Sequence, residues 1–206
     1  MARKASSSRW LRRQQRDPYV HKAHQEGWRS RAVYKLEELD RHNKLLHPGQ
    51  SVVDLGAAPG GWSQYAVQRV GDTGRVFALD LLDMDPLAGV EYIRGDFSDE
   101  EIYQELLERL GSDRVELVVS DMAPNISGNR SVDQPRAMLI AEQALDFAVR
   151  VLADNGAFVC KLFHGEGFDE FVRECRRQFR EVRVRKPAAS RPTSRETYLV
   201  ARTKRL

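Results

Sequence analysis

The sequence predicts an α/β fold in which a mostly parallel sheet of seven strands carries helices on both faces. Three observations support this prediction. Short apolar runs alternate with longer amphipathic segments along most of the 206 residues, which is typical of strand–helix–strand units. Several of the apolar runs end in an aspartate. The last two runs alternate apolar and polar residues, which indicates a final antiparallel pair of strands.

Apolar spacing and glycine stops define the first elements. Residues 32–43 place apolar side chains at helical spacing, and Pro48-Gly49 ends that helix. Residues 51–55 form a buried strand. A glycine-rich turn then leads into a helix at residues 62–70, which Gly71 ends.

The next two strands each end in an aspartate. They are expected at residues 74–80 and 90–96. Ser98 and Glu101 have the spacing of a capping box, which opens a helix with leucines on one face. Gly111 ends this helix.

The second half of the chain repeats the pattern. A strand at residues 115–121 is followed by a polar loop at 125–133, a long helix at 134–152 and a strand at 156–161. The chain closes with an amphipathic helix and two alternating strands, at residues 168–179, 181–186 and 197–201.

Charge is distributed very unevenly along the chain. Residues 1–31 hold nine Lys or Arg and two acids, residues 32–172 hold twelve and 25, and residues 173–206 hold twelve and three. Two basic ends therefore flank an acidic middle, which favours binding of a polyanion. We expect residues 1–30 to be a basic arm that is poorly ordered on its own, and residues 31–206 to be a single catalytic domain.

Aromatic residues make a nucleic acid the favoured polyanion. Trp10, Tyr19 and Trp28 are interleaved with the amino-terminal arginines, which suits contact with bases or sugars. The alternative is ordinary solvated charge. We expect the backbone of an RNA to be held by basic residues of both ends, namely Arg9, Arg29, Arg31, Lys186 and Arg195.

Composition also bears on the cellular setting. The longest apolar runs are too short to span a membrane, and we expect no membrane partner and no metal. Cys160 and Cys175 fall on apolar positions, so we expect buried thiols in a reducing cytoplasm. The Ser- and Arg-rich amino terminus leaves a mitochondrial presequence as an alternative.

The most informative segment is the glycine-rich turn after the first strand. The strand ends with Asp54, and the glycines that follow are Gly56, Gly60 and Gly61. This spacing is not the G-x-G-x-x-G of dinucleotide-binding folds, and Asp54 would repel a pyrophosphate. A ligand that carries positive charge would be favoured, and S-adenosyl-L-methionine has a sulfonium and an ammonium group. A purely structural turn is the alternative.

Acids at the ends of several strands are expected to meet on one rim. Because ligands bind beyond the carboxyl ends of parallel strands, Asp54, Asp80, Asp96, Asp121 and Lys161 are candidates for one site.

Individual roles follow from position along this rim. Asp80 follows Gly61 by 19 residues, which suits hydrogen bonds to the ribose of a bound adenosine. We expect Gly60 to contact the cofactor through its backbone and Trp62 through its ring. Asp96 would accept from the adenine amino group, with a structural turn acid as the alternative.

Motifs along nearly the whole chain resemble the FtsJ/RrmJ (RlmE) family of ribose 2′-O-methyltransferases. The resemblance is carried by residues 6–10, 29–36, 53–65, 80–86, 95–97, 120–125, 133–138, 161–170, 183–187 and 194–198. It implies a Rossmann-like methyltransferase fold, S-adenosyl-L-methionine as cofactor and, as in the bacterial branch, a uridine in the A-loop of large-subunit ribosomal RNA as target. We expect a monomer that acts on the 50S subunit.

The same resemblance implies the residues of the site. The family's Lys-Asp-Lys-Glu tetrad falls on Lys35, Asp121, Lys161 and Glu196. Cofactor-binding positions of the family fall on Gly60, Trp62, Asp80, Asp96 and Asp121. Lys161 is the family's proposed base; alternatively it stays charged and steadies the developing alkoxide while water takes the proton.

Other functions stay open at this point. A nicotinamide-dependent oxidoreductase could use a similar sheet, although Asp54 and the missing G-x-G disfavour it. A non-catalytic ribosome-assembly protein could keep the same fold. Within the methyltransferases, a transfer RNA anticodon loop or mitochondrial ribosomal RNA is the alternative substrate.

Overall fold

Seven strands form one sheet, as the sequence predicts. The structure, a computed structural model, describes residues 17–205. The strands are β1 (Ser51–Leu55), β2 (Arg75–Asp80), β3 (Val90–Arg94), β4 (Val115–Ser120), β5 (Leu152–Phe163), β6 (Phe179–Arg185) and β7 (Glu196–Lys204). The helices are α2 (Pro18–Gln25), α3 (Val33–Asn43), α4 (Gly61–Val70), α5 (Glu100–Leu110), α6 (Arg130–Val151) and α7 (Phe168–Gln178).

The strand order places the first half of the chain on one side of the sheet and the second half on the other. The order is β3-β2-β1-β4-β5-β7-β6. The pairs from β3 to β5 are parallel, and β7 is antiparallel to both β5 and β6. The mostly parallel sheet with an antiparallel carboxyl-terminal pair is confirmed.

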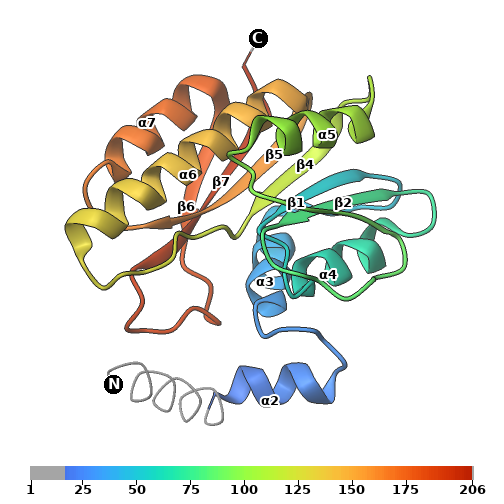
Figure 1. Ribbon diagram of the computed structural model, residues 1–206, viewed down its shortest axis with the longest axis horizontal. Coiled ribbons are helices and arrows are strands. Elements are labelled where there is room, and N and C mark those ends of the chain that lie inside the picture. The colour runs from blue at the N-terminus through green and yellow to red at the C-terminus, as the bar shows by residue number, and fades with distance from the viewer. Residues whose placement is uncertain (1–16, 206) are drawn as a thin grey trace.

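Helices cover both faces of the sheet (Figure 1). On one face, α5, α6 and α7 contribute Leu106, Leu145 and Phe171 to a core with the strands. On the other face, α3 and α4 pack Leu36 and Ala66 against the same strands. The central strands are therefore apolar on both sides, which explains their continuous apolar runs.

The segment before α3 contains a helix, α2, that packs against the rest of the protein. Asp17 caps α2 by accepting from a backbone N–H, and Ala23 of that helix is buried against Val33 and Tyr34. This part of the expected arm therefore includes a helix that has an apolar contact of its own. Residues 1–16 lie outside the described residues.

Two helices begin at other residues than expected. The cap of α5 is Asp99, which accepts from the N–H of Glu101 at 3.0 Å. Ser98 instead donates its hydroxyl to the carboxylate of the preceding turn, so the predicted capping box is wrong. Helix α6 starts one turn earlier than Gln134, because the side chain of Asn129 caps it.

The cysteines lie in the core, as the sequence predicts. Cys160 on β5 and Cys175 on α7 are free and buried in the cluster beneath α6 and α7. They contribute to packing there. Across residues 17–205, no helix has both the length and the apolar character needed to cross a membrane.

Candidate functional site

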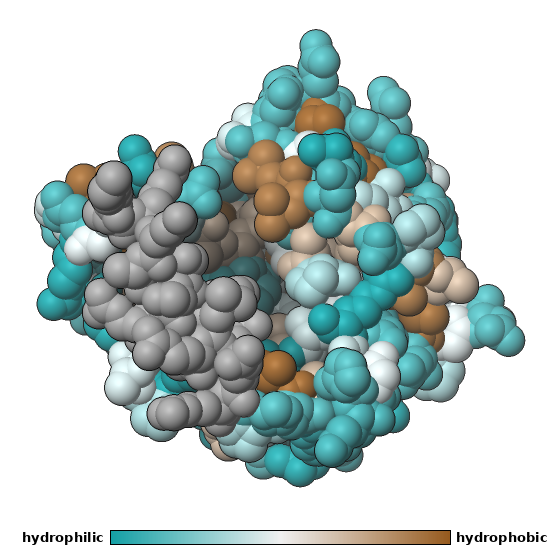
Figure 2. Space-filling view, turned by 60° about the horizontal axis from the view of Figure 1, so that its bottom comes forward, coloured by the Kyte–Doolittle hydropathy of each residue, from teal (hydrophilic) through white to brown (hydrophobic). Residues whose placement is uncertain are grey.

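The carboxyl ends of the parallel strands bring the predicted acids to one edge of the sheet. Asp54 is the penultimate residue of β1, Asp80 is the last residue of β2, and Asp121 directly follows β4. The N–H of Gly95, beside Asp96, donates to the backbone carbonyl of Asp80 at 2.9 Å. Figure 2 turns this end of the molecule toward the viewer and shows a hollow in it.

The antiparallel strand β7 supplies the last acid of the tetrad. Because β7 runs opposite to β5, its first residue, Glu196, lies at the edge where β5 ends. Lys161 of β5 is directly opposite Tyr198 of β7. Lys35 reaches the same edge from the first turn of α3. The four residues that the family resemblance groups are thus together in space.

The tetrad forms one chain of ion pairs and hydrogen bonds. The Nζ atom of Lys35 is 2.7 Å from Oε1 of Glu196, and Nζ of Lys161 is 3.1 Å from Oδ1 of Asp121. Lys161 also donates to the backbone carbonyl of Asp121. The two pairs are joined by Tyr198, whose hydroxyl accepts from Lys35 at 3.1 Å and donates to Asp121 at 2.7 Å. Positive and negative groups therefore alternate along the chain.

The environment keeps Asp121 ionised. Burial alone would raise the pKa of its carboxyl, but Lys161, Lys35 and the Tyr198 hydroxyl outweigh burial and hold the pKa below its ordinary value. Burial, together with the charges of Asp121 and Glu196, raises the pKa of Tyr198 well above its usual value. Tyr198 therefore stays protonated and keeps donating.

Sequence reasoning gave no role to two residues of this network. Tyr198 has the strand spacing of a core aromatic, and its ring does pack against Trp62. Ser190 is buried in the loop before β7 and donates its hydroxyl to Oε1 of Glu196 at 2.9 Å. The signal that could have found Tyr198 is its position two residues after Glu196, on the same face of one strand.

The glycine-rich turn after β1 brings backbone very close to its neighbours. Gly56 has a φ of +79°, and a Cβ there would lie 2.8 Å from the backbone nitrogen of Met122. Gly60, with a φ of +104°, forms the amino-terminal cap of α4. A Cβ on Gly61 would overlap Oγ of Ser30. Glycine is required here by both conformation and space.

Asp54 is a buried acid whose charge is only partly compensated. It is fully buried, and Ser63 donates to its Oδ2 at 2.6 Å, whereas its Oδ1 has no hydrogen-bond partner among the described residues. Burial raises the pKa of Asp54 to about 7, against the opposing effect of Ser63, and the charges of Asp121 and Asp80 raise it further. This donor set fits a positively charged ligand and disfavours a phosphate.

The other two acids are oriented by backbone N–H groups. Asp80 accepts from Ala58 at 2.9 Å and from Leu82 at 2.8 Å. Asp96 accepts from both the N–H and the hydroxyl of Ser98, and these bonds lower the pKa of its carboxyl. Asp96 therefore stabilises the turn before α5, which is the structural alternative to adenine binding, while its side chain remains exposed.

Trp62 does not offer its ring to a cofactor. The side chain is buried at 3% exposure, and its Nε1 donates to the carbonyl of Ala32 at 2.7 Å. The expected ring contact is therefore wrong, because the first turn of α4 turns this residue toward the core. Its backbone N–H, one residue after Gly61, is still at the start of the helix.

The basic residues predicted to contact RNA divide into two kinds. Arg29 donates to the carbonyls of Asp85 and Pro86, and Arg31 pairs with Asp17 at 3.2 Å and donates to the carbonyl of Ala189. Both side chains therefore hold segments of the protein together. Lys186 and Arg195 are exposed on the segment between β6 and β7, although each also donates to a backbone carbonyl. Arg9 lies outside the described residues.

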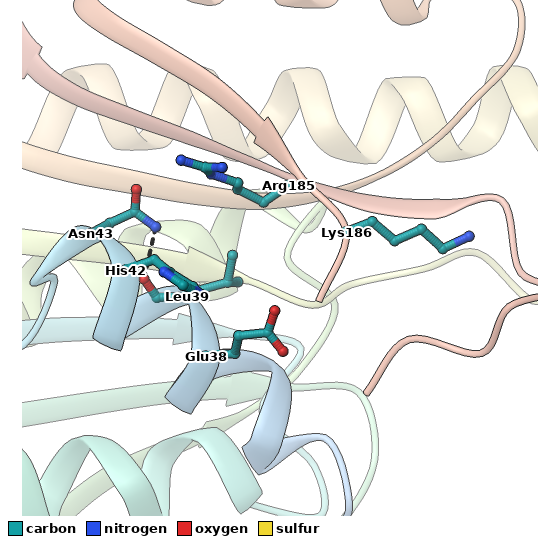
Figure 3. Close-up of a pocket in the computed structure, with 6 residues that line it drawn as sticks. All are labelled: Glu38, Leu39, His42, Asn43, Arg185 and Lys186. Atoms are coloured by element: carbon teal, nitrogen blue, oxygen red, sulfur yellow. Dashed lines mark hydrogen bonds between the residues drawn. The ribbon is translucent and has the colours of Figure 1, made fainter. Parts of the chain in front are cut away.

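A groove of about 190 Å³ separates the end of α3 from the end of β6 (Figure 3). Arg185 lies across from the last turn of α3, and the side chain of Lys186 points away from that helix. Glu38 of α3 accepts from the N–H of Ala188 at 2.8 Å, which ties the following loop to α3. Two cations, Arg185 and Lys186, and the carboxylate of Glu38, which already accepts a hydrogen bond from Ala188, thus line a groove that is open to solvent.

Among residues 17–205, no cluster of three or more His, Cys, Asp or Glu side chains is arranged to hold a metal ion. The ring of His164 lies beside that of Phe168, with centroids 4.3 Å apart and the planes tilted by 32°. Its backbone N–H donates to Arg195. These contacts place it in the loop after β5 and give it no part in the tetrad.

Known proteins share both the sequence pattern and the fold. The sequence profile of the FtsJ-like methyltransferase family matches residues 28–204. A crystal structure of a Plasmodium falciparum protein, provisionally named a ribosomal RNA methyltransferase, superposes with a TM-score of 0.77 at 26% identity, covering 86% of this chain and 98% of that one. A Clostridium thermocellum protein, provisionally named an rRNA methylase, shares the fold with a TM-score of 0.55 at 18% identity, covering 82% of this chain and 97% of that one.

The family match spans the strands and the tetrad alike. It begins just before α3, which carries Lys35, and ends in β7, which carries Glu196. Every element that brings a charged residue to the sheet edge therefore lies within the matched region. The chain belongs to the FtsJ-like methyltransferase family.

Proposed function

We propose that this protein transfers a methyl group from S-adenosyl-L-methionine to a ribose 2′-hydroxyl of large-subunit ribosomal RNA. The observation that carries this proposal is the unequal charge of the sheet edge. Asp54 has a carboxylate oxygen with no partner among the described residues. In the adjacent tetrad, by contrast, Lys35 pairs with Glu196 and Lys161 with Asp121. One side thus suits a cationic methyl donor, and the other suits a weakly acidic hydroxyl.

The residues for the cofactor are those of the glycine-rich side. Gly56, Gly60 and Gly61 let the ligand approach backbone, Asp54 balances its positive charge, and Asp80 is oriented to accept from ribose hydroxyls. Asp96 is exposed at the next strand end for an amino group of the adenine. When bound, the cofactor supplies an electrophilic methyl group.

The tetrad would position the acceptor hydroxyl and receive its proton. A ribose hydroxyl is a very weak acid, so alignment with the methyl group and removal of the proton are the tasks left to the protein. The nearly buried amine of Lys161 is held by Asp121 at 3.1 Å. The proton leaves either to the Lys161 amine or, with Lys161 charged and steadying the oxygen, to water. Both routes require Lys161 beside the reacting oxygen.

The exposed basic residues near the site and the similarity to another protein favour ribosomal RNA as the substrate. The basic carboxyl-terminal segment exposes Lys186 and Arg195 next to the site, and contacts to phosphates supply most of the affinity of RNA-binding proteins. The Plasmodium falciparum relative is provisionally named a ribosomal RNA methyltransferase. Our specific proposal is a uridine of the A-loop in 23S RNA, methylated by a cytoplasmic monomer on the assembled 50S subunit.

One experiment tests this proposal. Large subunits that lack the modification are incubated with the protein and S-adenosyl-L-methionine labelled in the methyl group, and the label is mapped by nuclease digestion and mass spectrometry. We expect a single 2′-O-methylated uridine. Label on a base, or label on transfer RNA but not on large subunits in a parallel reaction, would contradict the proposal.

A further inference from the structure

A second cavity lies beside the tetrad, on the side away from the glycine-rich turn. It has a volume of about 150 Å³, and its walls include Pro124, Ile126, Ala137, Phe163, Thr193 and Arg195. Pro124 follows Asp121 by three residues, Phe163 follows Lys161 by two, and Arg195 directly precedes Glu196. Three of the segments that carry the tetrad therefore also build this cavity.

The walls of the cavity are fixed by hydrogen bonds. Gln134 donates to the carbonyls of Phe163 and Glu166, both at 3.0 Å. The carboxylate of Asp133 accepts from the backbone of Ser127 at 2.9 Å and of Gly128 at 3.0 Å, which pins the loop that carries Ile126. The cavity thus belongs to the folded structure and does not depend on a ligand to form it.

Its lining combines the apolar side chains of Pro124, Ile126, Ala137 and Phe163 with the polar ones of Asp133, Gln134 and Thr193 and one cation, Arg195. Ile126 is 68% exposed although its loop is pinned, so a large apolar side chain is kept in solvent at the mouth. The carboxylate of Asp133 is already used by its own loop. Arg195 is exposed and is the cation among the residues that line this cavity. An apolar ring with a negatively charged neighbour is the complementary ligand.

We infer that this cavity binds the base of the nucleotide whose ribose is methylated, with Arg195 near an adjoining phosphate; this rests on the proposed function. A cavity of about this volume accommodates a six-membered ring. Bases stack on side chains in a sequence-tolerant way, and arginine adds charge attraction to the phosphate. Phe163 ends β5, and β4 lies between β5 and the β1 and β2 side of the sheet, so base and cofactor would approach the tetrad from opposite sides.

Three variants test the inference without touching the tetrad. Ile126→Ala removes the apolar side chain at the mouth, and Ala137→Phe fills the cavity from α6. Leu139→Ala is the matched control, since Leu139 is also an exposed apolar residue, at 57%, two positions further along α6. Thermal melting and calorimetry with S-adenosyl-L-methionine confirm that each variant is folded and binds cofactor as the wild type does.

The substrates are reconstituted large subunits in which the target nucleotide carries its base or no base. For the wild type we expect kcat/KM to fall about 5- to 100-fold without the base, as for the loss of one stacking contact. Ile126→Ala and Ala137→Phe should lower kcat/KM by a similar factor on the normal substrate and show little further loss on the abasic one. Leu139→Ala should stay within about twofold of the wild type on both substrates, because its side chain does not line the cavity.

Two results would overturn the inference. One is equal methylation of normal and abasic subunits by the wild type. The other is an unchanged kcat/KM for both Ile126→Ala and Ala137→Phe. Failure of the proposed function appears differently, as absence of ribose methylation by the wild type in the mapping experiment, and the inference would then fall with it.

Discussion

The two sides of the sheet edge balance their charges in different ways. On the β1 and β2 side, Asp54, Asp80 and Asp96 form no ion pair with any other residue of the described range 17–205. On the β5 and β7 side, two lysines alternate with two carboxylates, and a tyrosine joins them. One edge of one sheet therefore holds an unbalanced site and a balanced one.

The unbalanced side is the part of the site that relies on its ligand. Leaving a buried carboxylate without a cation costs stability, so such an arrangement is expected where a positively charged ligand completes it. The tetrad needs no ligand to neutralise it, so its geometry is set before the substrate arrives. Substitutions on the two sides should therefore separate cofactor binding from methyl transfer.

The largest effect is expected from Lys161→Ala. Removing the amine beside the reacting oxygen should lower the rate of methyl transfer at saturating cofactor about 10²- to 10⁴-fold, the usual contribution of a positioned acid or base. The Kd for S-adenosyl-L-methionine should change little, because Asp54 and the glycine-rich turn are untouched. Rates of label incorporation and calorimetry measure the two quantities. Arg173→Ala, on the exposed face of α7, is the control, and a wild-type rate in Lys161→Ala would remove the tetrad from the mechanism.

Asp54→Asn should produce the opposite pattern. Losing the buried charge should raise the Kd for the cofactor about 10- to 100-fold, the worth of a hydrogen bond or contact to a charged group. The rate at saturating cofactor should stay near that of the wild type. An unchanged Kd would show that the cofactor's cation lies elsewhere.

The same substitution should stabilise the free protein relative to the wild type increasingly as the pH rises from about 4 to about 7. Because folding raises the pKa of Asp54 from 3.8 to about 7, the folded wild type holds a proton that the unfolded chain releases. Its unfolding free energy therefore decreases as pH rises from about 4 to about 7. Asparagine does not ionise, so the stability of Asp54→Asn does not fall for this reason. The difference in Tm between the variant and the wild type should therefore increase over that pH interval. A Tm difference that is constant with pH would contradict the pKa assignment.

A smaller effect is expected from Tyr198→Phe. The ion pairs Lys35–Glu196 and Lys161–Asp121 are retained in this variant. The loss of the bridging hydroxyl should therefore cost about 1 to 2 kcal/mol of unfolding free energy. Methyl transfer should fall by less than about tenfold, since that corresponds to 1.4 kcal/mol in the barrier. Denaturant unfolding and single-turnover rates measure these changes. Tyr103→Phe is the control, because the Tyr103 hydroxyl takes part in a long hydrogen bond, 3.5 Å from Arg150. Equal losses in both variants would show that the bridging hydroxyl of Tyr198 has no special role.

Much of the fold and the acid-rich half of the site followed from the sequence. Apolar runs and glycine stops located the strands within a few residues, and parallel strands must end at one edge. Asp54, Asp80 and Asp121 could therefore be grouped before their positions were seen. The physical reason is that strand period and strand direction are local properties.

The rest depends on contacts between distant parts of the chain. Lys35 lies in the helix before the first strand, and Glu196 begins β7, which runs antiparallel to both β5 and β6. Only the family resemblance therefore grouped these two residues with the strand ends. Arg31 looks like a free cation in the sequence, yet its partner Ala189 is 158 residues away. Trp62 looks like a ligand contact, yet the helix turns its ring to the core. Local pattern carries no information on such pairings.

The most direct test of the unbalanced side is the number of protons released when the cofactor binds. Near pH 7 a carboxyl with a pKa of about 7 is half protonated, and a bound cation should drive that proton off. Calorimetry of S-adenosyl-L-methionine binding in buffers of different ionisation enthalpy measures the release. We expect wild-type protein to release about half a proton more than Asp54→Asn. Equal release by the two proteins, or uptake by the wild type relative to the variant, would contradict the account.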